Sequence, residues 1–473
     1  MATDDSPPPP EPTAPAEPTK PRPSGLRAWW TAGREAGGRL VRERPGWIGF
    51  TAGLLVGAVL ASLVFAYGLP RFEARGWESG DLVLLSGRDD SVGGQRQVLI
   101  QEWNLLHPDH RVRIEEVPST ADGERSEMLA RARGDDGAVD VLNLDVAWLP
   151  EFAEAKLIRT LSDGDVDRSS FLSGPLETCE YAGDLWGLPF NTDAGLLYRR
   201  VDLVPNAPDS WGTLQSEMDR VLYTPSKSPA NPVAGLVTQL ADYEGLTVNA
   251  LEAVWSAGGA IVDEHGDVQV DSRAAKEGLQ RLVDGVRRTK VQRILPQSLT
   301  YTEIPSTEAF RDGRALFMRN WPVAYGTLSA PAEPGTAEAR TATPKFQVSP
   351  LPWPSVLGGQ NLAIAHRSAH PRAARALIDF LTDARSQQIL FERGGFAATR
   401  TVVYDDPVVL ARYPYAGALR TAVENARLRP RSPHYALFSE VLHNAVYSML
   451  ITGKGPPADL ADRLRAALRG QLD

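Results

Sequence analysis

The sequence predicts an α/β protein with more than one compact unit, and three observations lead to this prediction. Residues 81–155 alternate between short apolar runs typical of buried strands and stretches with apolar residues at helical spacing. Residues 346–368 contain a second system of strand-like runs. The chain of 473 residues is also too long for one ordinary hydrophobic core.

The first part of this pattern describes one α/β unit. The runs "DLVLLS", "RVRIEEV" and "VDVLNLD" are apolar or alternate as strands do, and a helical pattern follows each of them. We expect strands at residues 81–86, 111–117 and 139–145 and helices at residues 92–106, 124–133 and 147–155. Because strand and helix alternate, these strands should form a largely parallel sheet.

The later segments carry helix caps and turn signals. Ser210 and either Asp271 or Ser272 can cap helices, Gly258 suits a helix end, and residues 265–266 suit a hairpin turn. We expect helices at residues 212–221, 246–257, 371–395, 435–450 and 458–472, a further helix that ends at 286, and strands at residues 196–200, 315–320, 346–354 and 358–368.

The N-terminal sequence predicts a disordered cytoplasmic tail over residues 1–46 and a transmembrane anchor over residues 47–69. The start of the tail is rich in Pro, Ala, Thr and Glu and has too few aliphatic residues to offset its chain entropy. Residues 47–69 contain no charge and, at about 1.5 Å per residue, span roughly 30 Å of hydrocarbon as a helix.

The charges beside residues 47–69 orient this anchor. Arginines are frequent before it and scarce after it, which places the tail in the cytoplasm and residues after about 70 outside the cell. The arginines before it are Arg27, Arg34, Arg39, Arg42 and Arg44. A cleaved signal peptide is the alternative, since Ala66 is a small residue near the end of the apolar run. A lipid-anchored form is excluded, because the only cysteine, Cys179, lies far downstream.

Composition excludes several classes of partner. The formal net charge is −9 and no basic stripe interleaves with aromatic residues, so we expect no nucleic acid partner. One cysteine cannot form an intramolecular disulfide or a cysteine cluster for a metal. Asp163, Asp165 and Asp167 resemble the start of a calcium loop, but Arg168 stands where glycine is needed. We therefore expect no metal and no cofactor.

Enzyme motifs are also missing from the sequence. It contains no signature of a hydrolase nucleophile, a zinc protease, a phosphate-binding loop or a dinucleotide site. Asp145 and Asp193 could in principle form a glycosidase pair, but such a pair needs one carboxyl group kept protonated, and nothing in the sequence indicates this. We expect a protein that is not an enzyme.

Two loops after predicted strands are candidates for ligand binding. Ligands of α/β sheets collect beyond the carboxyl ends of the strands, where residues 86–90 and 145–148 lie. Asp145 and Trp148 suit a polyhydroxylated ligand, because a carboxylate accepts hydroxyl hydrogens and an indole covers the apolar face of a sugar. The alternative is structural, with Trp148 in the core of the short helix and Asp145 as its N-cap.

Several segments, in their order along the chain, carry a resemblance to a known family. They are "YAGDLWGLPFNTDAGLLYRR", "APDSWGTL", "WSAGGAIVDEHGDVQVD", "EAFRDGRALFMRNWP", "GGQNLAIAHRSAHPRAARALIDFLTDARSQQILFERGGFAATR" and "GPPADLADRLRAAL". Together they resemble the family 1 extracellular solute-binding proteins, the sugar-binding components of ABC importers that include maltose-binding protein. The likeness runs from about residue 81 to the C-terminus.

The resemblance implies a two-lobed, periplasmic-binding-protein-like clamp with crossover hinge strands, preceded by one transmembrane helix. The first lobe would comprise residues 80–190 and 323–380, and the second lobe residues 191–322 and 381–473. The polar trio of Asn191, Thr192 and Asp193 would then lie where the chain first crosses between the lobes, facing the cleft.

The resemblance also implies site residues. In the family a carboxylate at the position of Asp193 and an aromatic ring at the position of Trp321 touch the sugar, whereas without the resemblance Trp321 would be read as core. The expected ligand-binding residues are Arg88, Asp145, Trp148, Asn191, Asp193, Tyr243, Trp321, Gly358, Gly359, Gln360 and Tyr435, of which Arg88 and Tyr243 are the weaker matches.

The expected function is binding of a carbohydrate, an oligosaccharide in the first instance, for delivery to the permease subunits of an ABC transporter. The protein would be held in the cell membrane through residues 47–69 with its binding domain outside the cell. A membrane-tethered sensor that signals through a partner protein is the alternative, because the family seldom carries a Pro-rich cytoplasmic tail.

Overall fold

The computed structural model describes residues 76–471 except 90, 118–120, 135–136, 224–231, 288–289 and 331–343. All of these residues belong to one compact unit that covers residues 70–473. The expected tail (residues 1–46) and the expected anchor (residues 47–69) lie outside the described residues. Within the described part, no helix combines the length and apolar character needed to cross a membrane.

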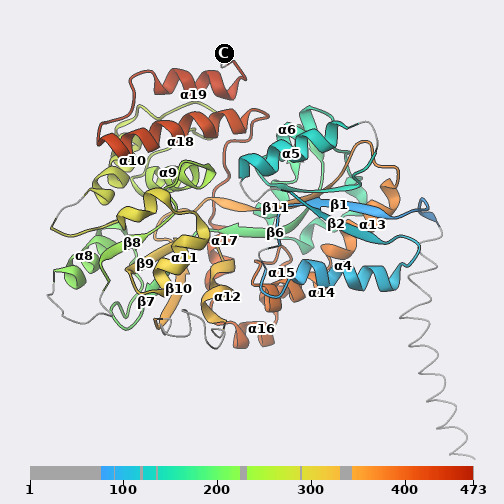
Figure 1. The fold of residues 1–473 in the computed structure, drawn as a ribbon, viewed down its shortest axis with the longest axis horizontal. Helices are drawn as coiled ribbons and strands as arrows, with labels where there is room; N and C mark the ends of the chain where they lie inside the picture. Colours follow the sequence, from blue (N-terminus) through green and yellow to red (C-terminus); the bar gives the residue numbers. More distant parts are fainter. Residues whose placement is uncertain are drawn as a thin grey trace, which may run out of the picture. The chain divides into compact units, whose positions relative to one another are not determined.

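The first sheet has five strands in the order β2-β1-β3-β11-β6. Their bounds are β1 Leu82–Ser86, β2 Val112–Glu116, β3 Val141–Asp145, β6 Leu188–Ala194 and β11 Leu357–Ile364. β1 pairs in parallel with β2 and β3, as the alternation of strand and helix predicts, whereas β11 is antiparallel to both β3 and β6. The helices near this sheet in Figure 1 include α4 (Gln95–Leu106), α5 (Ala121–Arg133), α6 (Leu149–Glu154) and α13 (Pro371–Leu381).

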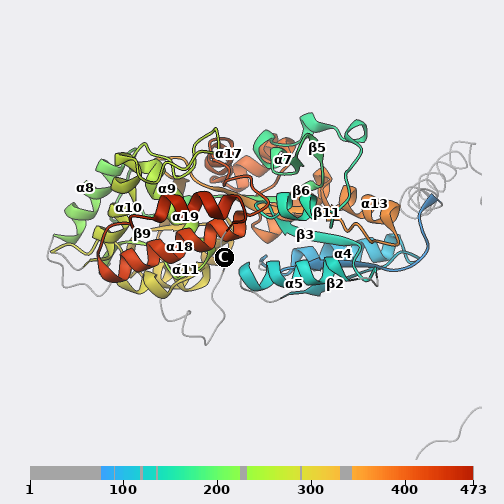
Figure 2. The same cartoon turned by 90° about the horizontal axis from the view of Figure 1, so that it is seen from above.

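The second sheet has four strands in the order β10-β7-β9-β8. Their bounds are β7 Leu196–Arg200, β8 Ala234–Val237, β9 Ala315–Asn320 and β10 Phe346–Pro350. The helices around it include α8 Trp211–Leu222, α9 Glu244–Ser256, α10 Arg273–Val286, α11 Glu303–Arg311, α18 Tyr435–Thr452 and α19 Leu460–Leu468. α18 packs against both α9 and α19, and Figure 2 shows α18 and α19 side by side.

The chain passes between the two sheets three times. Gly195 alone separates β6 of the first sheet from β7 of the second, and a short segment connects β10 back to β11. The third passage leads from α17 (Ala416–Glu424), which contacts β6 and β10, to α18. These passages join two α/β halves into a two-lobed fold. β10 falls inside the range 323–380 expected for the first lobe, yet it pairs with β7 in the second sheet; the exact lobe boundaries remain a prediction.

The expected single helix over residues 371–395 is wrong, because the structure divides it. α13 ends at Leu381, and the side chain of Asp383 accepts a hydrogen bond of 2.6 Å from the backbone of Ser386, which starts α14 (Ala384–Ile389). A π-helical turn, Leu390–Gly394, follows directly. Asp favours an N-cap over a helix interior, because its carboxylate satisfies backbone N–H groups at a helix start.

The expected helix caps are present where the sequence puts them. Ser210 and Thr213 form a reciprocal capping box at the start of α8, and Ser272, rather than Asp271, caps α10. The remaining short elements are α7 Ser173–Glu177, α12 Val323–Ser329, α15 Thr401–Asp405, α16 Pro407–Arg412, β4 Glu180–Tyr181 and β5 Asp184–Leu185.

Candidate functional site

The register of the first sheet brings several candidate residues onto one face. Gln360 of β11 stands opposite Asp145 of β3 on one side and opposite Asn191 of β6 on the other. Two residues earlier, Gly358 stands opposite Asp193. Because paired residues in a sheet point to the same side and successive residues alternate, these side chains share one face.

Trp321 joins this face from the second sheet. Trp321 follows the end of β9, and its backbone carbonyl accepts a hydrogen bond of 2.7 Å from the hydroxyl of Tyr198. A Cβ atom built on Gly358 would lie 3.3 Å from the Cβ of Asp193 and 3.5 Å from the ring of Trp321. The side chain of Asp193 and the ring of Trp321 therefore flank the position that a side chain at residue 358 would occupy.

The ring of Trp321 is bounded by charged groups. The guanidinium carbon of Arg319 lies 3.9 Å from the ring centroid and covers one face. The indole N–H donates to the Glu303 carboxylate at 3.4 Å, and the hydroxyl of Tyr243 donates to the same oxygen at 2.9 Å. A ligand stacked on Trp321 would therefore have to lie on the face opposite Arg319.

Arg319 is itself fixed by a buried ion pair. Its guanidinium donates to both oxygens of Glu252 at 2.8 and 2.6 Å, and both side chains are only 4% exposed. The backbone N–H of Val356 donates to Glu252 as well, at 3.0 Å. This two-point pair, close to the passage into β11, holds the guanidinium over the ring of Trp321.

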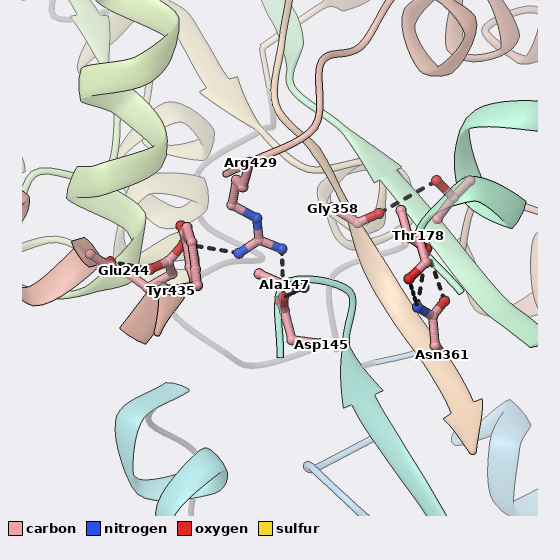
Figure 3. A network of polar contacts seen from close by, with 10 residues as sticks. Asp145, Ala147, Thr178, Glu244, Gly358, Asn361, Arg429 and Tyr435 are labelled. Atoms are coloured by element: carbon pink, nitrogen blue, oxygen red, sulfur yellow. Dashed lines mark hydrogen bonds and ion pairs between the residues drawn. The ribbon is translucent and has the colours of Figure 1, made fainter. Parts of the chain in front are cut away.

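A second arginine connects the two halves of the molecule (Figure 3). Arg429 lies on the passage between α17 and α18, and its guanidinium binds Asp145 of the first sheet at 2.5 Å and Glu244 of α9 at 2.9 Å. Glu244 also accepts from the hydroxyl of Tyr435 at 2.5 Å and from the hydroxyl of Ser439. Arg429 thus connects the end of β3 to the start of α9 through two ion pairs.

Burial and neighbouring charges shift the pKa values of the acidic residues in these two clusters. Loss of contact with water and the carboxylate of Asp145 raise the pKa of Asp193 to about 7, against the opposing effects of Arg319 and Arg429. Burial also raises the pKa of Glu244, although Arg429 acts to lower it. The carboxylates of Asp145 and Glu244 in turn raise the pKa of Arg429 despite its burial, so the guanidinium stays charged.

The raised pKa of Asp193 bears on the glycosidase alternative. A protonated carboxyl group is one requirement of such a pair, and no sequence pattern indicated one. The other carboxylate, Asp145, is held by Arg429 and accepts the backbone N–H of Ala147 at 2.8 Å. Asp145 is therefore engaged in the fold, which does not favour a role as nucleophile or base.

Asn191 is an unusual buried polar residue. Its side chain is 2% exposed, and in the described part of the chain neither its Nδ2 nor its Oδ1 atom has a hydrogen-bond partner. A buried amide without partners is costly, so such groups point to a bound molecule or to ordered water. Asn191 lies on the same sheet face as Asp193, two residues away.

The other candidates lie in different surroundings. Trp148 is 7% exposed and is part of the core beside α6, and it is the N-cap residue there instead of Asp145. Tyr435 is 2% exposed and supports Glu244. Arg88 is exposed in the loop after β1, a strand that β3 separates from β11. Gly359 has a φ of 113°, and a Cβ there would clash with the Asn191 carbonyl oxygen.

Sequence reasoning missed five charged residues of these clusters: Glu244, Glu252, Glu303, Arg319 and Arg429. Their partners are distant in the chain, with 284 residues between Arg429 and Asp145 and 67 between Arg319 and Glu252. One signal was available, since Arg319 lies in the apolar strand run "ALFMRN" directly before Trp321. A charge at a buried strand position needs a partner, even when its identity is unknown.

Comparisons with known proteins give a consistent result. A family model described as bacterial extracellular solute-binding protein matches residues 100–416. A "Probable ABC transporter-binding protein" of Deinococcus radiodurans is 30% identical over 377 residues, which cover 76% of this chain and 86% of the relative. An "Arabinooligosaccharide-binding protein" of Halalkalibacterium halodurans is 20% identical over 65% of this chain and 69% of its own length.

Solved structures agree on the fold. The maltose-bound MalE3 protein of T. maritima is 29% identical, with a TM-score of 0.72 over 83% of this chain and 100% of that chain. The GacH receptor of Streptomyces glaucescens, solved without ligand and with acarbose, is 23% identical, with a TM-score of 0.66 over 84% of this chain and 99% of that chain. The second likeness concerns the fold alone.

Proposed function

Because this chain belongs to the family of bacterial extracellular solute-binding proteins, we propose that it binds a carbohydrate between its two lobes and delivers it to the permease of an ABC importer. Two similar proteins carry names that support a sugar: one is bound to maltose and the other is an arabinooligosaccharide-binding protein. The relative from Deinococcus radiodurans supports the transporter partner.

The observation that carries the proposal is the meeting of Asp193, Asn191 and Trp321 where the chain passes between the sheets. A carboxylate and an unpartnered amide can satisfy sugar hydroxyls, and the face of the indole opposite Arg319 could cover the apolar face of the ring. Specificity in such a site comes from giving every buried polar group a partner. Ligand hydroxyls would supply the partners that Asn191 lacks.

We propose that the lobes close over the ligand and that Arg429 connects them in the closed state. Arg429 binds Asp145 at the end of β3 and Glu244 at the start of α9, so these contacts connect the two halves. A ligand held by both halves favours the same arrangement, because it binds the closed state more tightly than the open state. The permease would then recognise the closed form.

We also propose that residues 47–69 anchor the protein in the membrane with the binding domain outside the cell. The uncharged run and the arginines before it support this orientation. Labelling of intact cells with a membrane-impermeant lysine reagent tests it: Lys276 and Lys345 should react, whereas Lys20 in the tail should react only after lysis. Labelling of Lys20 in intact cells would contradict the orientation.

A thermal-shift screen tests the binding function. The full-length protein, purified in detergent, is heated with a panel of mono- and oligosaccharides, and a true ligand present at about 100 times its Kd should stabilise the fold by roughly 2.7 kcal/mol. A sugar that raises the melting temperature supports the proposal. The absence of a shift with every sugar, or hydrolysis of a glycoside by the purified protein, would contradict it.

A further inference from the structure

The charges near Trp321 do not balance within the described part of the chain. Arg319 is paired with Glu252, and Arg429 is shared by Asp145 and Glu244. Asp193 and Glu303 have no Lys, Arg or His partner among the described residues. Five carboxylates therefore face two guanidinium groups. Glu303 accepts a hydrogen bond from Trp321, and Asp193 lies across the empty side-chain position of Gly358 from the same ring.

The two unpaired acids also act on one another. Glu303 accepts hydrogen bonds from the indole of Trp321 and the hydroxyl of Tyr243, which hold its carboxylate in place. Its negative charge adds to that of Asp145 in opposing the ionisation of Asp193. Like charges that are partly removed from water repel more strongly than in bulk solvent, so the arrangement is costly without a counter-charge.

Asn191 is independent evidence that a molecule belongs in this space. Its amide is 2% exposed and unpartnered in the described part of the chain, and the register of β6 places it on the same face as Asp193. An amide offers both a donor and an acceptor, which suits the hydroxyl groups of a polyol. The bound molecule would thus have hydroxyl groups near Asn191 and a positively charged group that compensates the carboxylates of Asp193 and Glu303.

Resting on the proposed function, we infer that the ligand is a carbohydrate with a positively charged nitrogen, an amino sugar, whose ammonium group lies between Asp193 and Glu303 beside Trp321. An ammonium group supplies the missing counter-charge and up to three N–H donors for the two carboxylates. The open face or edge of an indole is a further favourable contact for a cation. A neutral sugar of the same shape would supply no positive charge to compensate Glu303 or an ionised Asp193.

Matched sugars test this inference. We would measure the affinity of the full-length protein at about pH 7 for α- and β-1,4-linked glucosamine mono-, di- and trisaccharides, and for the same lengths of the glucose and N-acetylglucosamine series. The 2-amino group resembles an α-amino group, with a pKa of about 7.7–8.0, so it carries its charge at this pH, and N-acetylation removes that charge. We expect the amine to bind about tenfold or more tightly than both neutral counterparts.

Two variants locate the effect. Asp193→Asn and Glu303→Gln should each weaken binding of the amine about tenfold more than binding of the neutral sugars, so that the preference for the amine falls by that factor. Their controls are Asp462→Asn and Glu264→Gln, whose side chains are 85% and 89% exposed and lie on other elements. These controls should keep the preference unchanged, and because there are two independent variants, misfolding of one leaves the other decisive.

The outcomes separate this inference from the proposed function. Neutral sugars that bind as tightly as the amines, or a preference that survives both variants, would overturn the amino-sugar inference and leave carbohydrate binding standing. Binding of no sugar in any series would overturn carbohydrate binding itself, and this inference with it.

Discussion

Two neighbouring clusters of charged residues, one around Arg429 and one around Trp321, differ in how far their carboxylates are paired with cations. Around Arg429, each carboxylate has a cation and several hydrogen bonds, and little is left for a ligand to satisfy. Around Trp321, Asp193 and Glu303 have no basic partner among the described residues, and the nearby Asn191 has no hydrogen-bond partner there. The first cluster therefore connects parts of the fold, and we propose that the second is completed by a bound molecule.

The largest expected effect comes from breaking a satisfied pair. Glu252→Gln removes the counter-charge of Arg319 at a site where both side chains are 4% exposed. Loss of one member of a buried pair leaves the other charge without compensation, so the variant should lose about 3 to 5 kcal/mol of unfolding free energy in urea denaturation.

The control for this prediction is an exposed pair. Asp462→Asn breaks the ion pair with Arg465 on the surface of α19, where the aspartate is 85% exposed. Such pairs contribute at most about 1 kcal/mol. If Glu252→Gln lowered the unfolding free energy no more than this control, the ion pair between Arg319 and Glu252 would not contribute to the stability of the fold.

The next effect comes from removing an unsatisfied charge, and it depends on pH. The pKa of Asp193 is about 7 in the folded chain against an ordinary value of 3.8. A raised carboxyl pKa means that the folded state binds more protons, so stability is lost as the pH rises from about 4 to 7. Asp193→Asn should therefore be neutral near pH 4 and more stable than wild type by up to roughly 4 kcal/mol above pH 7.

Urea denaturation at a series of pH values measures this difference. Asp462→Asn, which removes an exposed carboxylate on α19, again serves as the control. A stability difference for Asp193→Asn that does not grow with pH would show that Asp193 is compensated, and the contrast between the clusters would fail.

A moderate effect is expected in the strand that links the two clusters. β11 places Gln360 opposite Asp145 and Gly358 opposite Asp193, and Gly359 between them has a φ of 113°. Gly359→Ala adds a Cβ that clashes with the Asn191 carbonyl oxygen in a backbone conformation unsuited to alanine. We expect a loss of about 2 kcal/mol in unfolding free energy.

Gly417→Ala is the matched control, because the added Cβ meets no atom within 4 Å and the residue lies in α17. Alanine favours a helix over glycine, so this variant should gain about 0.5 to 1 kcal/mol. Equal effects of the two substitutions would mean that the conformation at residue 359 does not constrain the site.

The sequence allowed much of the architecture to be predicted, because it depends on local signals. The apolar runs at β1, β3 and β9 and the caps at Ser210 and Ser272 are visible in the chain itself. The break at Asp383 was equally local, and an Asp three residues before Ser386 in a long helical pattern could have indicated it.

The charged clusters could not be predicted in the same way. The polar trio of residues 191–193 stood out because it interrupts an apolar run, whereas Trp321 became a candidate only through the family resemblance. The structure brings Asp193 and Trp321 near one another around Gly358. Which acids are paired depends on contacts such as that between Arg429 and Asp145, which lie 284 residues apart. No local pattern distinguishes the neutralised Asp145 from the unpaired Asp193.

The most direct measurement of the central claim is a calorimetric titration of wild type and Trp321→Ala with a sugar that raises the melting temperature of the wild type. Loss of a buried aromatic contact should weaken binding by about 1 to 3 kcal/mol. Trp186→Ala is the control, since its indole donates to the carbonyl of Tyr181 beside β5 and should leave binding unchanged. Equal affinity of wild type and Trp321→Ala would contradict the claim that the sugar lies against Trp321 and Asp193.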